Sequence, residues 1–434
     1  MDRPDFEQGV IIPAISTASS TAAIRSLGRK DIKTVVISEH DSPPGVRSKY
    51  CDVQIPVPDP TEDLPGYEQA LRVLARRPDV ETILPFREAD IYILSKNKSY
   101  FAEHLGTVWP SLETLNKVQD RIQLRDAAIA ANVALPKTTT LDNWTDWKTP
   151  AVTKPRYTVH APEYNEEFTC PHPESGSTTY LPPDIEPDTE KIISEMGHIP
   201  IIQEYIPTTD EYGFFAQYDE GEPVATFQHR QHRGWKYAGG PSAYRESVSI
   251  PALERAGRAL LDELDWDGVA MVEFLRDPET DEFKLMEINP RFWSSLPFTV
   301  QAGVDFPFMY YQQATETEIP SQRPYKAGIG GHLLRGEALH LYSILREDSP
   351  LVERPSFAGA ARDIALSLVT QPRFDYASRD DPGPFVAEVA NALNSLQPKY
   401  RKQSTIEPET TDIKETENTR NRAAVARVFS WLYQ

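Results

Sequence analysis

The chain has 434 residues and a formal net charge of −20, and 39% of its residues are hydrophobic. A chain of this size can bury a large core and divide into two or three domains, while its negative charge argues against general affinity for nucleic acids or anionic membranes. No run of about 18 apolar residues predicts a membrane span, and no signal-peptide pattern is present. Two cysteines are too few for a disulfide framework, so a cytoplasmic location is expected.

The N-terminal part alternates short β-rich runs with helical patterns. "GVIIPAIS" and "KTVVISEH" flank the helical "STAAIRSLGRK", and "VETILPF" precedes another helical pattern. Such alternation predicts an open parallel sheet and an α/β domain over residues 1–110. The first strand–helix turn has neither G-x-G-x-x-G nor G-K-[ST], so nucleotide binding is not expected there.

The next segment begins with a helical pattern that starts after Ser111 and closes near Pro136, which predicts one or two capped helices. A strand is expected over "TPAVTKPRY". The following stretch, about 157–190, is rich in proline, serine, threonine and glutamate and is interpreted as a mobile loop. Its His160, Cys170 and His172 include no fourth ligand at a recognised zinc spacing, so a loop is favoured over a metal site.

Residues 211–296 show an antiparallel β pattern with one helix, "ALERAGRALLDEL". Within it, "KLMEINPRFW" places Glu287, Asn289 and Arg291 at alternate positions, and on a strand alternate side chains share a face. If the hairpin "GVAMVEFLRDPETDEFKLMEINPRF" reverses at "PET", Glu273 lies opposite Glu287.

The same register sets Phe274 against Met286. Opposed carboxylates on a sheet destabilise it, and a divalent cation such as Mg²⁺ with oxygen ligands would offset the repulsion. The alternative is a hairpin whose acidic side chains simply face water.

These motifs together resemble the ATP-grasp superfamily, most closely its carboxylate–amine ligase and carbamoyl-phosphate-synthase-like or biotin-carboxylase-like branch. The motifs that carry the resemblance are "EINPRFW" with Glu273, "NKVQDR" at Lys117, "VTKPR" at Lys154, "IIQEYIPTTDEYGF" and "YAGGPSAYRES". Their order and spacing match over roughly residues 10–315. The glycine-rich lid of many members is missing, since only Gly176 is available in that interval.

The resemblance implies a fold and a site. The fold would comprise a parallel-sheet pre-ATP-grasp domain (1–110), an ATP-grasp domain of two α+β subdomains (111–315) with 157–190 as a lid-like loop, and a mostly helical C-terminal region (316–434). The implied residues are Lys117 and Lys154 for the phosphates, Gln203, Glu204, Tyr205 and Ile206 for adenine, Glu211 for ribose, Glu273, Glu287 and Asn289 for Mg²⁺ or Mn²⁺, and Arg291 and Arg245 for catalysis. Lys117 could instead be a solvated surface charge, and Arg245 a structural ion pair.

The activity implied is ATP-dependent and ADP-forming. ATP would phosphorylate a small-molecule carboxylate to an acyl phosphate, and an amine would displace the phosphate. The alternatives are bicarbonate-using chemistry, as in a carboxylase or a carbamoyl-phosphate enzyme, and a protein that binds ATP without catalysis. A second copy of the chain is another expected partner.

The C-terminal region after about residue 316 matches no recognised motif. Its polar stretch at about 400–419 is expected to be disordered. Near the end, apolar residues follow helical spacing and predict an amphipathic helix, namely Val425, Val428, Phe429 and Leu432. That helix would pack on its own domain or on a second subunit, or alternatively on a membrane surface or a partner.

Overall fold

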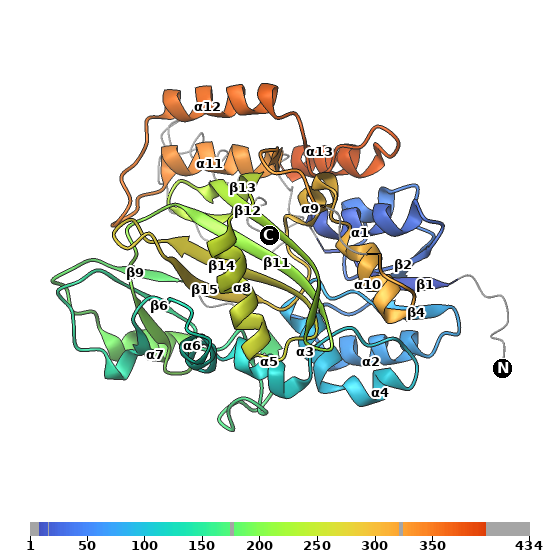
Figure 1. Cartoon of the computed structure of the whole chain (residues 1–434), viewed down its shortest axis with the longest axis horizontal. Helices are drawn as coiled ribbons and strands as arrows, with labels where there is room; N and C mark the ends of the chain where they lie inside the picture. Colours follow the sequence, from blue (N-terminus) through green and yellow to red (C-terminus); the bar gives the residue numbers. More distant parts are fainter. Residues whose placement is uncertain (1–7, 16, 174–177, 321–323, 396–434) are drawn as a thin grey trace, which may run out of the picture.

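The computed structural model describes residues 8–15, 17–173, 178–320 and 324–395, and it forms two four-stranded sheets, one six-stranded sheet and one two-stranded ribbon (Figure 1). The stretch at about 400–419 and the expected terminal amphipathic helix lie outside these residues. Among the helices within them, none combines the length and the apolar character needed to cross a membrane.

A parallel sheet forms the N-terminal part, as the alternating pattern predicts. Its strands in spatial order are β3 (Val53–Pro56), β2 (Lys33–Ser38), β1 (Gly9–Pro13) and β4 (Val80–Ile83). Its helices are α1 (Ala18–Gly28), α2 (Leu64–Ala75), α3 (Glu88–Lys96) and α4 (Lys98–Ala102), with the short 3-10 helix η1 (Pro44–Arg47). Every residue of β1 is buried, which explains its continuous apolar sequence. The strand order reverses at β1, since β2 and β3 lie on one side of it and β4 on the other.

Two consecutive helices follow, α5 (Leu112–Gln119) and α6 (Arg121–Ala130). The Ser111 side chain accepts a hydrogen bond from the backbone N–H three residues further on, at 3.1 Å. The Asp120 side chain accepts one from the N–H two residues further on, at 3.0 Å. Both caps satisfy N–H groups that the first turn of a helix leaves open, so the prediction of capped helices is confirmed.

A small antiparallel sheet comes next. Its strands in spatial order are β5 (Thr138–Thr140), β10 (Ile201–Glu204), β6 (Ala151–Lys154) and β9 (Thr179–Leu181), accompanied by η2 (Leu141–Asn143) and α7 (Thr189–Met196). A two-stranded ribbon of β7 (Val159–His160) and β8 (His172–Pro173) lies between β6 and β9 in the sequence. The stretch 157–190 is therefore not one continuous loop. Pairing of β9 with β6 uses backbone groups, which a polar sequence supplies as well as an apolar one.

The six-stranded sheet is the centre of the molecule. Its strands in spatial order are β15 (Phe283–Asn289), β14 (Gly268–Arg276), β11 (Glu211–Asp219), β12 (Glu222–Lys236), β13 (Gly239–Ser247) and β16 (Gly330–His332). Helix α8 (Pro251–Glu263) lies across one face, as Figure 1 shows, where Phe214 packs in the same core as Leu253. On the other face, Phe215 contacts Phe227 and Trp293. Alternate residues of β11 thus belong to two different cores.

After β15, the elements in the described part of the chain are helices except for β16, the short edge strand of this sheet. The helices are α9 (Leu296–Ala302), α10 (Phe306–Ala314), α11 (Leu334–Arg346), α12 (Phe357–Thr370) and α13 (Gly383–Ser395). Helix α11 packs on β12 and β13, α12 packs on α11, and α13 reaches back to η1 of the N-terminal part (Figure 1). The expected boundaries near 110 and 315 stay predictions.

The β14–β15 hairpin departs from the expected register by one residue. Glu273 pairs with Glu287 as predicted, but Phe274 pairs with Leu285 instead of Met286 because a bulge interrupts the ladder between Glu273 and Phe274. A bulge leaves one residue of a strand without a partner and re-aims its neighbours. Met286 consequently stays outside the buried core that Leu285 joins.

Candidate functional site

The opposed carboxylates lie on the face of the six-stranded sheet that α8 does not cover. Cross-strand partners share a face, so Glu273 and Glu287 project to the same side. Burial raises the pKa of Glu273, and the neighbouring charges of Glu287 and Glu211 raise it further. Burial acts in the same direction on Glu287, but Arg121 and Lys154 outweigh it and lower the pKa of Glu287. The Glu273 charge is the less well compensated of the two.

The rest of the "EINPR" motif continues from these carboxylates. Asn289 donates from Nδ2 to Oε1 of Glu273 at 3.1 Å, and its Oδ1 accepts from Nη2 of Arg291 at 2.8 Å. Arg291 donates from Nε to Oε1 of Glu88 at 2.8 Å. Glu88 is the first residue of α3, so the N-terminal part contributes directly to the site. A carboxamide oxygen has two lone pairs, which leaves one on Asn289 for a cation.

Two cations face Glu287 from outside the hairpin. Lys154 ends β6, and burial lowers its pKa to about 8 although Glu287 opposes the shift. Within the described residues its ammonium makes no hydrogen bond or salt bridge. Arg121 contacts Oε2 of Glu287 at 3.2 Å and donates to the carbonyl of Pro155 at 2.8 Å.

Sequence reasoning missed Arg121 and chose Lys117 from the same "NKVQDR" segment. Lys117 lies in the last turn of α5, and in the described part of the chain no hydrogen bond or ion pair connects it to the carboxylates. Arg121 is the first residue of α6 because Asp120 ends α5 and caps the next helix. Aspartate before a helical run is a capping signal, so the sequence does contain the sign that the chain turns at this point.

The residues expected to bind adenine, 203–206, here called the hinge segment, form the end of β10 and the two positions after it. Gln203 donates to the hydroxyl of Thr138 at 3.0 Å, while its own Oε1 is buried and has no partner among the described residues. Glu204 forms a salt bridge with Lys284 at 3.1 Å. The N–H of Tyr205 donates to the carbonyl of Pro150 at 3.0 Å.

Ile206 is buried, and its N–H has no acceptor within the described residues. In the described part of the chain, the N–H of Ile206 and the carboxamide oxygen of Gln203 thus lack protein partners, three positions apart in the sequence. Buried polar groups are normally satisfied. This pair of open groups suits a flat ligand with both donors and acceptors on its edge.

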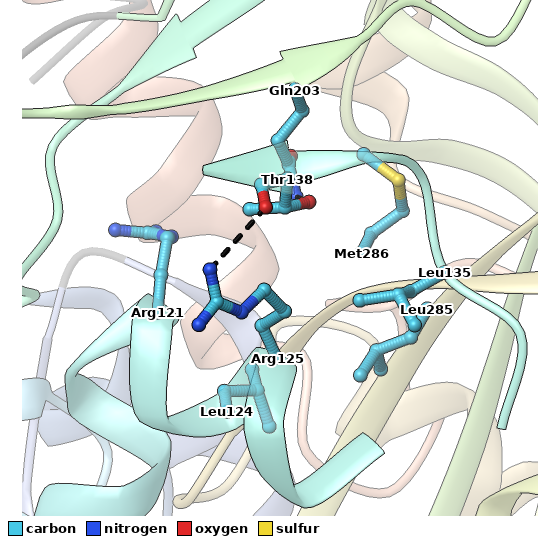
Figure 2. A pocket seen from close by; sticks show the side chains of 8 residues that line it. All are labelled: Arg121, Leu124, Arg125, Leu135, Thr138, Gln203, Leu285 and Met286. Atoms are coloured by element: carbon cyan, nitrogen blue, oxygen red, sulfur yellow. Dashed lines mark hydrogen bonds between the residues drawn. The ribbon is translucent and has the colours of Figure 1, made fainter. Parts of the chain in front are cut away.

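A small cavity lies beside the hinge (Figure 2). It is lined by Arg121, Leu124, Arg125, Leu135, Thr138, Gln203, Leu285 and Met286. Figure 2 shows apolar side chains of Leu135, Leu285 and Met286 on one side and the two guanidinium groups on the other. The bulge in β15 explains why Met286 reaches this cavity. Its apolar walls lie beside cationic groups, and its volume of about 10 Å³ is that of about one water molecule.

Glu211 lies at the start of β11, and a second cavity adjoins it. That cavity is lined by Thr209, Glu211, Gln231, His232, Arg233, Gly234, Lys236, Tyr237, Gly239 and His340. Burial raises the pKa of Glu211 to about 7, although Lys154 opposes the shift. Gln231 donates to Glu211 and to the carbonyl of Gly240. The turn at Gly239 has a φ of 127°, and a Cβ there would lie 3.3 Å from Oε1 of Glu211, so glycine allows the close approach.

The side chain of Arg245 makes no hydrogen bond or ion pair with the candidate site residues within the described part of the chain. It is buried, forms an ion pair with Asp375 and lies 5.4 Å from the ring of Phe298. Both partners are almost fully covered, so the contact favours the structural reading of Arg245 that the sequence left open.

Histidine and cysteine side chains do not assemble a metal centre in the described ranges. No group of three or more His, Cys, Asp or Glu side chains there is arranged to hold a metal ion. His160 and His172 instead hydrogen-bond to each other at 3.1 Å, and the His160 ring stacks on Phe168. The candidate cation site differs in kind, because it combines two carboxylates with one carboxamide.

No protein-family model matches the chain, and no curated protein matches its sequence. Solved structures do match its fold. N5-carboxyaminoimidazole synthetase from Staphylococcus aureus, complexed with ADP, is 12% identical with a TM-score of 0.55, over 84% of this chain and 98% of that one. The chain has the ATP-grasp fold.

Two other ATP-grasp structures agree. L-amino acid ligase from Bacillus licheniformis is 14% identical with a TM-score of 0.53, over 74% of this chain and 77% of that one. The biotin carboxylase domain of 2-oxoglutarate carboxylase from Hydrogenobacter thermophilus, solved with MgADP and bicarbonate, is 15% identical with a TM-score of 0.54, over 75% and 74%. At these identities the likeness concerns the fold.

The donor set of this chain fits a hard divalent cation. Two opposed carboxylates and an amide oxygen supply the oxygen ligands that Mg²⁺ prefers. Burial and the charges of Glu287 and Glu211 raise the pKa of Glu273, and a cation at this position would oppose that shift. The residues therefore fit Mg²⁺, and Lys154 and Arg121 fit the anion that would accompany it.

Proposed function

We propose that this chain is an ATP-dependent, ADP-forming ligase that joins a carboxylate to an amine through an acyl phosphate. The observation that carries the proposal is the convergence of Glu273, Glu287 and Asn289 with the cations Lys154 and Arg121 around one point. Phosphoryl transfer needs little more than positioning and charge neutralisation, so this set of residues is chemically sufficient.

The nucleotide would be held from three sides. The hinge segment from Gln203 to Ile206 would meet the adenine edge, and Met286 would pack against the ring. Glu211 would accept from the ribose hydroxyls. Lys154 and Arg121 would neutralise phosphate oxygens. Lys117, to which the resemblance assigns the same role, lies in the last turn of the preceding helix, α5.

The metal and Arg291 would serve the transfer itself. A divalent cation held by Glu273, Glu287 and the Asn289 oxygen would neutralise charge on the transferred phosphoryl group. Arg291 uses only part of its donor capacity on Glu88, Asn289 and the carbonyl of Phe292, so it keeps N–H groups for a carboxylate or an acyl phosphate. An incoming amine would then displace the phosphate without a covalent enzyme intermediate.

A screen of ADP release tests the proposal. Carboxylates, including amino acids, are combined with a panel of amines in the presence of Mg·ATP, and bicarbonate is included alone as a separate arm. We expect ADP release that requires both a carboxylate and an amine. Release with bicarbonate alone would favour carboxylase-type chemistry, and no release under any combination, together with no nucleotide binding, would contradict the proposal.

A further inference from the structure

A continuous line of hydrogen bonds connects the segment 157–173, here called the arm, to the metal-binding strands. In the arm, the Tyr164 hydroxyl donates to Oε1 of Gln119 at 2.7 Å, and Gln119 donates from Nε2 to Oε2 of Glu88 at 2.7 Å. The other oxygen of Glu88 accepts from Arg291, which in turn donates to Asn289. Asn289 donates to Glu273.

The line has one consistent direction of donation around Glu88. Glu88 accepts on both oxygens, from Gln119 and from Arg291, so each oxygen has a donor. Gln119 is fully buried, and its amide is oriented because the Tyr164 hydroxyl donates to its oxygen. Charge-assisted bonds to Glu88 are the strong members of the line.

Backbone contacts tie Gln119 to the arm as well. The N–H of Thr158 donates to the carbonyl of Gln119 at 3.1 Å, and the N–H of Arg121 donates to the carbonyl of Arg156 at 2.9 Å. The chain before the arm therefore runs beside the α5–α6 junction, and a displacement of the arm would displace Gln119 and Arg121 together.

We propose that Gln119 and Tyr164 are positioning residues that couple the arm to cation binding, acting through Glu88, Arg291 and Asn289. This inference rests on the proposed function, because it assumes a cation at Glu273, Glu287 and Asn289. Without the Gln119 amide, one oxygen of Glu88 loses its donor, and Arg291 alone holds the Glu88 carboxylate. The Asn289 oxygen is then directed by a guanidinium whose own partner is less firmly held.

The test measures how strongly Mg²⁺ assists nucleotide binding. The affinity for a non-hydrolysable ATP analogue is determined by calorimetry with Mg²⁺ and with EDTA, and the ratio of the two affinities is compared among variants. Gln119→Met should reduce the ratio roughly 10-fold, as expected for the loss of a partner that orients a metal ligand. Tyr164→Phe, which removes a single hydrogen bond, should reduce it about 3-fold. Affinity in EDTA should stay unchanged.

Tyr92→Phe is the matched control. The Tyr92 hydroxyl donates to Glu163 of the same arm at 2.8 Å, and its ring lies 5.9 Å from that of Tyr164. It therefore ties the arm to α3, whereas Tyr164 ties the arm to the end of α5, and it is not part of the line to Asn289. The ratio of nucleotide affinities with Mg²⁺ and with EDTA should be the same in Tyr92→Phe as in the wild type.

Three outcomes decide the matter. Wild-type ratios in both Gln119→Met and Tyr164→Phe, or an equal loss in Tyr92→Phe, would overturn the coupling and leave the proposed function standing. If the wild-type protein binds the analogue equally well with Mg²⁺ and with EDTA, the cation site and the coupling are both contradicted. If Gln119→Met does not fold, as judged by circular dichroism, Tyr164→Phe against Tyr92→Phe decides alone.

Discussion

Lys154 is a buried cation beside Glu287, an environment expected of a group that binds an anion. Its pKa is lowered to about 8 by burial, and in the described structure its ammonium has no hydrogen-bond partner. Lys154→Met keeps the side-chain length and removes the charge. We expect nucleotide affinity to fall at least about tenfold, the loss of one charged hydrogen bond, with little change in melting temperature.

Lys117→Met is the control for this prediction. Lys117 makes no described contact with the carboxylates, so its substitution should leave nucleotide affinity within about twofold of the wild type. Calorimetry on both variants separates the two lysines. A loss in Lys117→Met with none in Lys154→Met would reverse the assignment.

The two carboxylates should respond differently to removal of their charge. The folded-state pKa of Glu273 is raised, so above its unfolded value of about 4.5 the folded protein must lose a proton it prefers to keep, and Glu273 costs stability as pH rises. Glu273→Gln should therefore raise the melting temperature of the ligand-free protein at pH 7–8, on the order of 1–2 °C. It should also abolish most ADP formation.

The contribution of Glu287 to stability depends on pH in the opposite direction. Its folded-state pKa is lowered by Arg121 and Lys154, so its contribution is present above the unfolded pKa and is lost as pH falls through the folded value. Glu287→Gln removes the Arg121 ion pair and should leave ligand-free stability equal or lower at pH 7. Scanning calorimetry from pH 4 to 8 checks both variants, and an equal rise in both would show that the carboxylates act as a simple repelling pair.

Much of the residue-scale site was predictable because alternation along a strand fixes which side chains share a face. Glu273 opposite Glu287 followed from counting positions in the hairpin. The partner of Phe274 did not, since a bulge depends on local backbone geometry that a count of positions ignores. Arg121 was missed for another reason, because both Arg121 and Lys117 fit a phosphate role and only the break at Asp120 separates them.

At the scale of elements, the α5–α6 junction positions Arg121. Asp120 is buried, caps α6, and accepts two hydrogen bonds from Arg156, at 2.9 and 2.7 Å. Asp120→Ala removes the cap and leaves the guanidinium of Arg156 without its partner, so we expect a loss of about 3 kcal/mol in the free energy of unfolding. Nucleotide affinity should fall too, because Arg121 loses its fixed direction.

Denaturant unfolding gives the stability change, and Asp126→Ala provides the comparison. Asp126 lies in α6 and pairs with Arg125, but its side chain is 59% exposed. An exposed pair contributes at most about 1 kcal/mol. Similar losses in both variants would mean that the junction is no more than another surface contact.

At the scale of the whole molecule, the chain closes on itself through Asp381. This buried aspartate accepts from Arg25 at 2.8 Å, from the Ser48 hydroxyl at 2.7 Å and from the N–H of Lys49 at 2.9 Å. Arg25 and Asp381 are separated by 356 positions. Local periodicity predicts elements but carries no information on such distant pairs, so the sequence predicted C-terminal helices and not where they attach.

Asp381→Asn should therefore weaken the attachment of the C-terminal segment to the N-terminal sheet. The carboxyl side chain is 2% exposed, and its replacement leaves Arg25 buried without a counter-charge, which costs about 3–5 kcal/mol. Asp380→Asn, next in sequence, is the control. It alters an ion pair with Arg29 in which the aspartate side chain is 43% exposed, and it should cost at most about 1 kcal/mol. Scanning calorimetry should show Asp381→Asn melting earlier or in two steps, because the N-terminal sheet loses a tie to the rest of the chain. Since Glu88 and Arg291 join the same two parts at the site, nucleotide affinity should also decline in Asp381→Asn and not in Asp380→Asn. Coincident melting of both variants with the wild type would show that the other contacts, including the shared core of α1, α9 and α10, hold the two parts together without Asp381.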